Sequence, residues 1–296
     1  MSELFASDEI KWRRAARHAE RMILGSKIAM WIILLIGAVL FALPFYLMLT
    51  MSFKSASEIA QTSNWALPQE WTFDNYKRVL TNESAPFFLF LKNSVVVAVV
   101  STAGVLLSSS LVAYAFARLK FRGRDRLFIL LLSTMMLPGI VTTVPTYILF
   151  AQLRWVDTVL PLTVPAFFGG GAFNVFLLRQ FFMSIPRELD EAAILDGGSN
   201  ATIFWKVILP NSGAALATVG VFTFIYNWRD FMGPLIYLNS PEKQTLEVGL
   251  RTYQTLHQES WDLIMAAAVI VVLPLIVLFI IGQRYFVKGI VMTGIK

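Results

Sequence analysis

Six long apolar runs divide this chain of 296 residues, and they restrict its fold more than any other feature. A helix needs about 20 apolar residues to cross the roughly 30 Å of hydrocarbon in a bilayer, and it satisfies its own backbone hydrogen bonds there. Apolar and aromatic residues make up 56% of the chain and charged residues 15%, which is far from the composition of a soluble domain. The sequence therefore predicts an all-α integral membrane protein with six transmembrane helices, near residues 28–50, 91–117, 127–150, 159–183, 208–237 and 263–286.

Lysine and arginine are concentrated in two places, and their positions predict how the chain lies in the membrane. Residues 1–27 carry six of them, and five more fall within residues 118–126, between the second and third runs. Positive charge is retained in short cytoplasmic segments. We therefore expect both termini, and the connection between the fourth and fifth runs, to be cytoplasmic.

The net charge of +6 lies at these membrane edges and not in a soluble patch with interleaved aromatic residues. It predicts contact with membrane lipid and argues against nucleic-acid binding. The chain has no cysteine, and His18 and His257 are far apart, so no disulfide or metal site is expected. Residues 1–27 form a basic amino-terminal segment, which is either a helix on the membrane surface or a mobile leader.

A short polar segment separates the fourth and fifth runs. Pro186 in a first turn, Asp190 near the positive end of the helix dipole and Gly197 at the end predict a helix of about three turns. A second helix is expected from Ser199 until Pro210 marks a kink or break. Such a helix–turn–helix unit can act as a rigid knob that transmits a partner's motion. An amphipathic helix lying on the bilayer is the alternative.

The same segment resembles the EAA loop of the membrane subunits of bacterial ABC importers. The shared pattern is Glu-Ala-Ala, then Asp-Gly, then Leu-Pro, and here it comprises Glu191, Ala192, Ala193, Asp196, Gly197, Leu209 and Pro210. The resemblance implies a cytoplasmic coupling helix, within a loop at about 184–210, that contacts a separate ATPase. One departure is Gly198, which follows Gly197 where many relatives have another small residue and so predicts a more flexible turn.

The resemblance extends over most of the chain, to carbohydrate permeases of the maltose and glycerol-phosphate type. It rests on the segments 71–76 (WTFDNY), 114–118 (YAFAR) followed by 121–123 (FRG), 136–138 (MLP), 144–147 (VPTY) and 245–250 (TLEVGL). Within that family the chain is most similar to the six-span subunit that pairs with a second, related permease. The resemblance implies a place in the bacterial inner membrane, a permease domain at 28–287, and a carbohydrate as solute.

The same resemblance implies the partners. They are two ATP-binding subunits, which hold ATP and magnesium, a second permease and an extracytoplasmic solute-binding protein. No cofactor is implied in this chain, which is expected not to be an enzyme. The last external loop, at about 239–261, is implied to reach into the binding protein, or it is plain surface. The tail at 288–296 is implied to enter the ATPase dimer, or it is a disordered end.

Polar residues interrupt the fifth run at Asn227, Trp228, Arg229 and Asp230. Charges within a span are costly, so we expect these side chains to face the interior. An Arg229–Asp230 pair with Asn227 and Trp228 beside it is a candidate for contact with sugar hydroxyls and with the face of a sugar ring. The alternatives are an unwound outer helix end and a contact between the two permeases, with the solute site wholly on the other one.

Small residues in the second and fourth runs, Ser108 to Ser110 and Gly169 to Gly171, predict close helix packing or local unwinding. No Walker lysine follows the three glycines, so the chain is not expected to hydrolyse ATP. A permease for a non-sugar solute remains an alternative. A secondary transporter and a membrane enzyme are others, but inverted hydropathy repeats and a catalytic constellation are both missing from the sequence.

Overall fold

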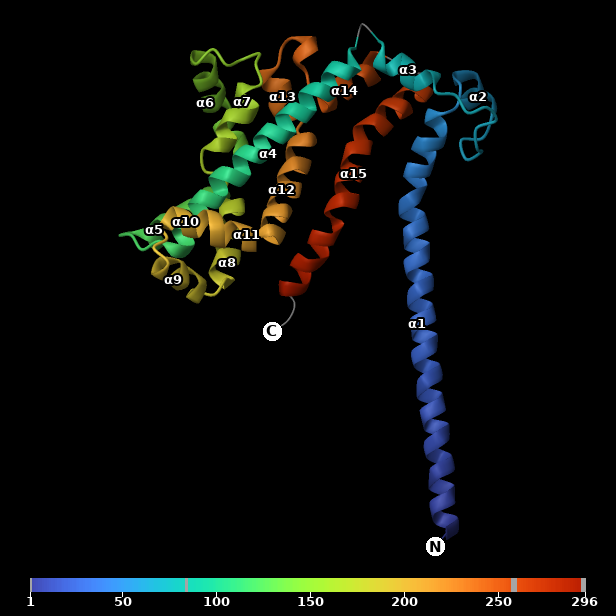
Figure 1. Cartoon of the computed structure of the whole chain (residues 1–296). Helices are drawn as coiled ribbons and strands as arrows, with labels where there is room; N and C mark the ends of the chain where they lie inside the picture. The colour runs from blue at the N-terminus through green and yellow to red at the C-terminus, as the bar shows by residue number, and fades with distance from the viewer. Residues whose placement is uncertain (1, 83–84, 257–259, 294–296) are drawn as a thin grey trace.

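The computed structural model describes the backbone of residues 2–82, 85–256 and 260–293, and the side chains of these segments except residues 2–23 and 284–293. Every regular element in these segments is a helix (Figure 1). The α-helices are α1 (Ser2–Ser52), α2 (Ala56–Gln61), α3 (Asp74–Leu80), α4 (Phe87–Arg118), α5 (Arg124–Ser133), α6 (Gly139–Gln152), α7 (Leu160–Thr163), α8 (Ala172–Ser184), α9 (Glu188–Leu195), α10 (Asn200–Thr202), α11 (Leu209–Asn211), α12 (Gly213–Trp228), α13 (Met232–Tyr237), α14 (Leu246–Leu256) and α15 (Trp261–Thr293). Three short 3₁₀ helices and a π-helical turn at Ile203–Ile208 complete the described segments.

Between four and six helical segments of the described residues are long and apolar enough to cross a bilayer, and with the helical backbone throughout they bear out the all-helical membrane fold. Leu24–Ser52, Phe87–Arg118, Leu160–Ser184 and Trp261–Gln283 each meet this condition alone. Two bent pairs within the described residues meet it only when each pair is taken as one span. One joins Arg124–Met136 to Gly139–Gln152 at 98°, and the other joins Asn200–Asn211 to Gly213–Trp228 at 78°.

Proline accounts for both departures from straight spans. Leu137 precedes Pro138 and is extended, with ψ of 120°, because the proline ring disfavours the helical conformation of the residue before it. The third run is therefore broken near its middle. The fifth run, 208–237, is interrupted near both ends, as the proline and the polar residues predicted: the chain bends at Ser212 after Pro210, and it unwinds between α12 and α13.

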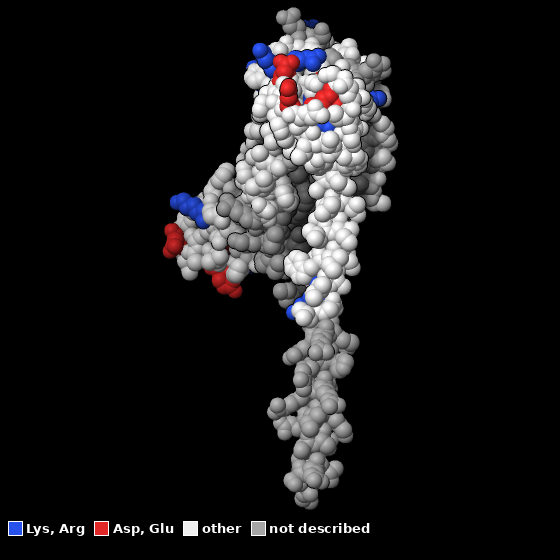
Figure 2. All heavy atoms as spheres, turned by 90° about the vertical axis from the view of Figure 1, so that its right-hand side faces the viewer, with Lys and Arg blue, Asp and Glu red and all other residues white. Residues whose placement is uncertain are grey.

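The two ends of the molecule differ in what they carry (Figure 1). The upper end holds α2, α3, α13 and α14. The lower end holds α9 to α11 (residues 188–211), here called the knob. The N-terminal end of α1 and the C-terminal end of α15 also point toward the lower end. Figure 2 shows charged side chains gathered at each end, with an uncharged band between them that matches a bilayer core. Which end faces the cytoplasm stays a prediction.

Helix α1 runs from Ser2 to Ser52 with no break at residue 27, where the predicted basic segment meets the first span. Residues 2–27 are therefore helical, as one of the two alternatives for this segment supposes. Their position on the membrane surface stays a prediction, and residues 294–296 of the predicted tail lie outside the described segments.

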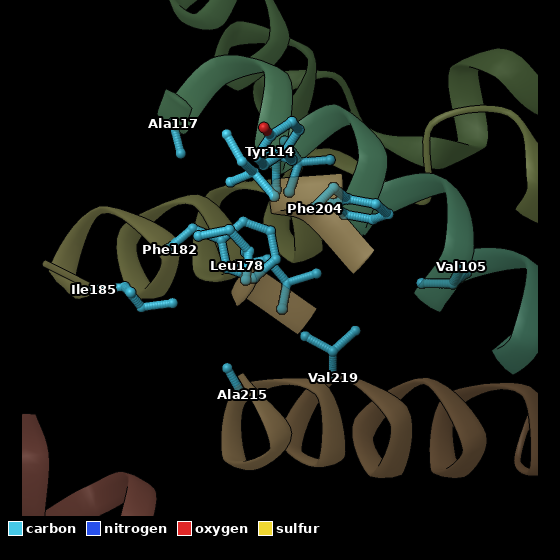
Figure 3. Close-up of a cluster of buried hydrophobic side chains, with 13 residues drawn as sticks. Val105, Tyr114, Ala117, Leu178, Phe182, Ile185, Phe204, Ala215 and Val219 are labelled. Atoms are coloured by element: carbon cyan, nitrogen blue, oxygen red, sulfur yellow. The ribbon is translucent and has the colours of Figure 1, made fainter. Parts of the chain in front are cut away.

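The core is divided into an upper and a lower cluster. In the lower cluster, Leu178 and Phe182 of α8 face Tyr114 of α4 and Phe204 of the π-helical turn, with Val219 of α12 nearby (Figure 3). The upper cluster joins α3, α4, α12, α14 and α15, and its aromatic members are Phe87, Phe90, Trp228 and Tyr253. The lower cluster matters most for function because the knob contributes to it.

Close packing of α4 on the chain between α7 and α8 confirms the prediction from the small residues. The hydroxyl of Ser108 donates to the carbonyl of Ala166 at 2.8 Å. Gly170 has a φ of +63°, and a Cβ built on it would lie 2.6 Å from the Cβ of Ser109. The three glycines thus unwind the chain and bring it against α4 at the same point.

Candidate coupling and translocation sites

The first helix of the knob, α9, is shorter than predicted. It has 8 residues, about two turns, because α8 continues through Ser184 and Ile185 is extended before Pro186. The helix therefore begins at Glu188 instead of Pro186, with Arg187 at the N-cap position. The predicted helix is present, but its expected first turn is part of the connection between α8 and α9.

Two glycines close the end of α9. Gly197 has a φ of +81°, and its N–H donates to the carbonyl of Ile194 at 2.9 Å. The N–H of Gly198 donates to the carbonyl of Ala193 at 2.7 Å, which completes a Schellman motif. A Cβ on Gly198 would lie 2.6 Å from that same carbonyl oxygen. The prediction that Gly198 loosens the turn is therefore wrong, since its missing side chain is what permits the tight closure.

The second half of the knob is fixed to the transmembrane core. The hydroxyl of Ser199 accepts from the N–H of Thr202 at 3.3 Å and so caps the helix that was predicted to start there. Phe204 and Ile208 are buried in the lower cluster. The hydroxyl of Tyr114 on α4 donates to the carbonyl of Asn200 at 3.0 Å. These contacts make the knob a rigid extension of α4 and α12.

An ion pair that sequence reasoning missed ties α9 to the end of α4. Arg118 lies 3.4 Å from the carboxylate of Asp190, and it donates to the carbonyl of Ile185 at 2.7 Å. The two side chains are 4% and 15% exposed, so the pair is largely shielded from water. Arg118 is the last residue of the YAFAR segment and Asp190 lies in the first turn of α9. No local sequence pattern links the two residues.

The predicted coupling residues divide into an exposed group and a hinge pair. Glu191, Ala192, Asp196 and Gly197 are exposed and Ala193 is half-buried; Leu209 packs on the lower cluster, and Pro210 is exposed just before the bend into α12. Sequence reasoning missed Ile194 and Leu195, whose exposed fractions are 58% and 88%. An apolar side chain so exposed at the charged end of a membrane protein is typical of a docking surface.

The structure does not bring the four predicted solute residues together. Trp228 is buried, donates from Nε1 to the carbonyl of Val271 at 3.1 Å and stacks on Phe224. Asp230 accepts from the N–H of Gly233 at 3.1 Å and so caps the start of α13. Arg229 is exposed, and no ion pair joins it to Asp230 within the described residues.

Of the four, only Asn227 lines the cavity between α4, the three-glycine segment, α8 and α12. This cavity has a volume of about 420 Å³; it is a candidate for the solute path and is here called the translocation cavity. Its lining combines aromatic and polar side chains, including Ser101, Phe173, Asn174, Phe222, Tyr226 and Asn227. Sequence reasoning missed Phe173, Asn174 and Tyr226; the available signal was that Phe222 and Tyr226 lie one helical turn apart on the face that leads to Asn227.

The predicted last external loop is mostly folded against the core. In α14, Leu246, Val248, Gly249 and Tyr253 are buried, and Gly249 lies directly on the ring of Phe90, with no room for a side chain. The TLEVGL element is therefore explained by packing of α14 on α4 and α15. Its reach into a binding protein stays a prediction.

At the upper end, Asp157 joins the connection between α6 and α7 to the connection between α13 and α14. Its carboxylate accepts from the N–H groups of Asn239 and Ser240 at 3.0 and 2.9 Å, and from Lys243 Nζ at 2.8 Å. Lys243 and these other donors hold the pKa of the Asp157 carboxyl well below its usual range. The link therefore persists at neutral pH and would weaken only in strong acid.

Residues 106–292 match the family of binding-protein-dependent transport system inner membrane components. The chain belongs to this family. Its members are membrane subunits of transport systems, and the match includes the knob, most of the lining of the translocation cavity and nearly all of α15. The tightly closed turn of α9 thus occurs in a membrane subunit of a transport system.

Individual relatives cover nearly the whole chain of this family member. It is 32% identical over 255 residues to the arabinooligosaccharide transport permease AraQ of Halalkalibacterium halodurans, covering 86% of this chain and 90% of that one. It is 34% identical over 266 residues to the sn-glycerol-3-phosphate transport permease UgpE of Yersinia pestis, covering 88% and 94%. Among solved structures, a bacterial ABC transporter that imports alginate has a chain with a TM-score of 0.77 at 25% identity, covering 88% and 95%.

Proposed function

We propose that this chain is a permease subunit of an ABC importer for a carbohydrate. It forms half of a translocation path and is driven by a separate ATPase through the knob. The observation that carries the proposal is the form of the knob. It is rigidly joined to α4 and α12, yet it presents Glu191, Ala192 and Leu195 outward, where no other described part of the chain covers them.

A helix with an exposed apolar face fits a groove on a partner protein. In the proposed mechanism, two ATP-binding subunits, which hold ATP and magnesium, each receive one permease's α9. Their closure around ATP draws the two knobs together and opens the cavity toward the outer side, and hydrolysis resets it. The knob end then faces the cytoplasm of a bacterial cell, as the positive charges near it predict.

The translocation cavity supports a sugar as the solute. Sugars offer hydroxyl groups that need donors and acceptors, and apolar ring faces that stack on aromatic side chains. Asn174 and Asn227 supply the amides, and Phe173, Phe222 and Tyr226 supply the rings. The named solutes of AraQ and of the solved transporter are an oligosaccharide and a polysaccharide, and that of UgpE is a polyol phosphate, so all three carry hydroxyl groups, which favours a carbohydrate over other solutes.

Two further partners belong to the proposal. The name of the family supports an extracytoplasmic solute-binding protein, which would dock at the upper end. A second, related permease would supply the other half of the path as a heterodimer. The first span supports this, because none of its most apolar window, within Leu24–Ser52, is buried inside this chain.

Copurification tests the whole proposal. The chain, tagged and expressed with its neighbouring genes, is expected to bring down an ATP-binding subunit, and the reconstituted complex should show ATPase activity that rises with binding protein and a sugar from a panel. Absence of any ATP-binding chain would overturn the proposal. An active complex that responds to no sugar would retain the ABC permease and reject the carbohydrate.

Replacing Glu191 with Ala should lower uptake more than it lowers the amount of protein in the membrane. The side chain is exposed and no described residue pairs with it, so its loss costs the fold little. We expect uptake to fall about tenfold or more, the effect of removing one hydrogen bond to a charged group, worth about 1.5–3 kcal/mol, from an interface. Uptake is measured at equal expression. Wild-type uptake by Glu191→Ala would mean that this carboxylate takes no part in coupling.

Replacing Tyr226 with Ala should weaken the response to sugar. The Tyr226 side chain is 74% exposed and lines the translocation cavity, so the change removes a stacking surface without opening the core. We expect the sugar concentration for half-maximal ATPase stimulation to rise about tenfold, while Tyr226→Phe, which keeps the ring, stays near the wild type. Equal behaviour of Tyr226→Ala and the wild type would show that the solute does not stack on this ring.

A further inference from the structure

Four arginines from four segments meet around one small cavity beside the knob. Arg118 ends α4, Arg124 begins α5, Arg179 lies on α8, and Arg187 precedes α9. The cavity has a volume of about 280 Å³, and none of its lining residues is acidic. We call it the arginine cavity. Its location at the lower end places it at the edge of the uncharged band.

The charges around the arginine cavity are only partly balanced. Arg124 pairs with Asp125 at 2.9 Å, and Arg118 pairs with Asp190 at 3.4 Å. The guanidinium of Arg179 lies 4.1 Å from the centre of a phenylalanine ring, and that of Arg187 forms no ion pair with another described residue. Four positive side chains against two negative ones leave an excess of two. An anion in the cavity would offset that excess.

The buried Arg118–Asp190 pair is incompletely hydrogen-bonded. The Nε of Arg118 and the Oδ1 of Asp190 are both buried and have no hydrogen-bond partner among the described residues. The ion pair therefore leaves a donor and an acceptor beside each other, and neither of these atoms by itself calls for a ligand. An anion is instead called for by the excess of positive charge around the cavity and by Arg187, which forms no ion pair among the described residues.

We infer that the arginine cavity binds a phosphate group carried by an anionic phospholipid. Guanidinium groups match phosphate oxygens with paired, charge-assisted hydrogen bonds, and basic pockets between membrane helices at the cytoplasmic side are suited to lipid headgroups. The membrane is close by: Phe121 and Leu127, on either side of Arg124, have exposed apolar side chains. A second hollow of about 540 Å³ shares Arg124 and Arg187 and is also lined by Lys120, Arg126 and one acidic residue, Asp125, so its charge is still positive on balance and it gives space for the remainder of a headgroup.

The site has a consequence for the knob. Arg118 holds α9 through Asp190 and holds the preceding turn through the carbonyl of Ile185. A phosphate in the cavity beside Arg118 would hold this guanidinium in place and so brace α9 against α4. This consequence rests on the proposed coupling role, whereas the binding of the lipid does not.

Lipid binding to the purified complex tests the inference directly. Native mass spectrometry and titration with phosphatidylglycerol should show one strongly held lipid, and Arg187→Gln should weaken it about tenfold, with Arg124→Gln/Arg187→Gln weakening it further. Arg122→Gln is the matched control. It removes the same charge from the same basic connection, but Arg122 lines neither hollow. Titration with inorganic phosphate tests whether a soluble phosphate binds as well as the lipid does. Titration with neutral phosphatidylcholine tests whether the lipid must carry a net negative charge.

Each outcome decides the inference. Selective loss in the Arg187 variants, with weak competition by inorganic phosphate, supports a lipid headgroup. Inorganic phosphate that binds as tightly as phosphatidylglycerol would replace the lipid by a soluble phosphate. An equal loss in Arg122→Gln would reduce the effect to net charge. If the Arg187 variants lost the ATP-binding subunit but kept normal lipid binding, the arginines would belong to the contact with that subunit. The inference of a lipid site fails in each of these last three outcomes.

Discussion

Replacing Leu195 with Asp is expected to nearly abolish transport while the chain still reaches the membrane. The side chain is 88% exposed at the end of α9, so no packing within the chain is lost. In the proposed complex it lies in a groove of the ATP-binding subunit, where a carboxylate would be buried without a partner. Changes at the centre of an interface commonly cost 2 kcal/mol or more, which corresponds to about 30-fold weaker association. Copurification of the ATP-binding subunit and sugar-stimulated ATPase activity measure the effect.

Leu67→Asp is the control for this prediction. Leu67 is 60% exposed, lies outside the spans and is at the upper end of the molecule, far from the knob. The same substitution there should leave the ATP-binding subunit attached. If Leu195→Asp retained the subunit as well as Leu67→Asp does, the apolar end of α9 would not be a docking surface, and the knob would have to act through Glu191 alone.

The knob also shows how far the sequence could lead. Its two helices, the turn at Gly197 and the break after Pro210 were predictable because caps, glycines and prolines act within a few residues of themselves. The Arg118–Asp190 pair was not, since it joins residues 72 positions apart in the chain. The role of Gly198 in the turn was mispredicted because it depends on the distance to the carbonyl of Ala193, which no pattern of residue types contains.

The fifth run illustrates the limit for the translocation site. Its polar residues correctly indicated a break, but periodicity does not say which side of a helix faces a cavity. Trp228 and Asn227 are neighbours in sequence, yet Trp228 enters the upper cluster against α15 while Asn227 faces the cavity beside α4 and α8. Successive residues on a helix point about 100° apart, so a cluster of four consecutive residues could not form one site without unwinding.

The three-glycine segment is where the fold and the cavity depend on each other most closely. Gly170 lines the cavity and lies against α4, whose Ser109 N–H and Val105 carbonyl would both be 2.8 Å from an added Cβ. These are backbone atoms of a long helix, which cannot rotate aside as a side chain can. Any residue larger than glycine must therefore push the segment between α7 and α8 away from α4.

Replacing Gly170 with Ala should accordingly be among the most damaging single changes in the chain. Overpacking commonly costs about 1–3 kcal/mol, and a left-handed φ adds about 1–2 kcal/mol for a residue other than glycine. We therefore expect the free energy of unfolding to fall by about 3–4 kcal/mol. Gly169→Ala is the matched control: its φ of +94° is at least as unfavourable for alanine as the +63° of Gly170, but no atom lies within 4 Å of the added Cβ. Heating in detergent followed by size-exclusion chromatography compares the two variants. Because the control carries at least as much φ strain, a clearly lower midpoint for Gly170→Ala isolates the contact with α4, and equal midpoints would mean that α4 and the cavity wall do not pack this closely.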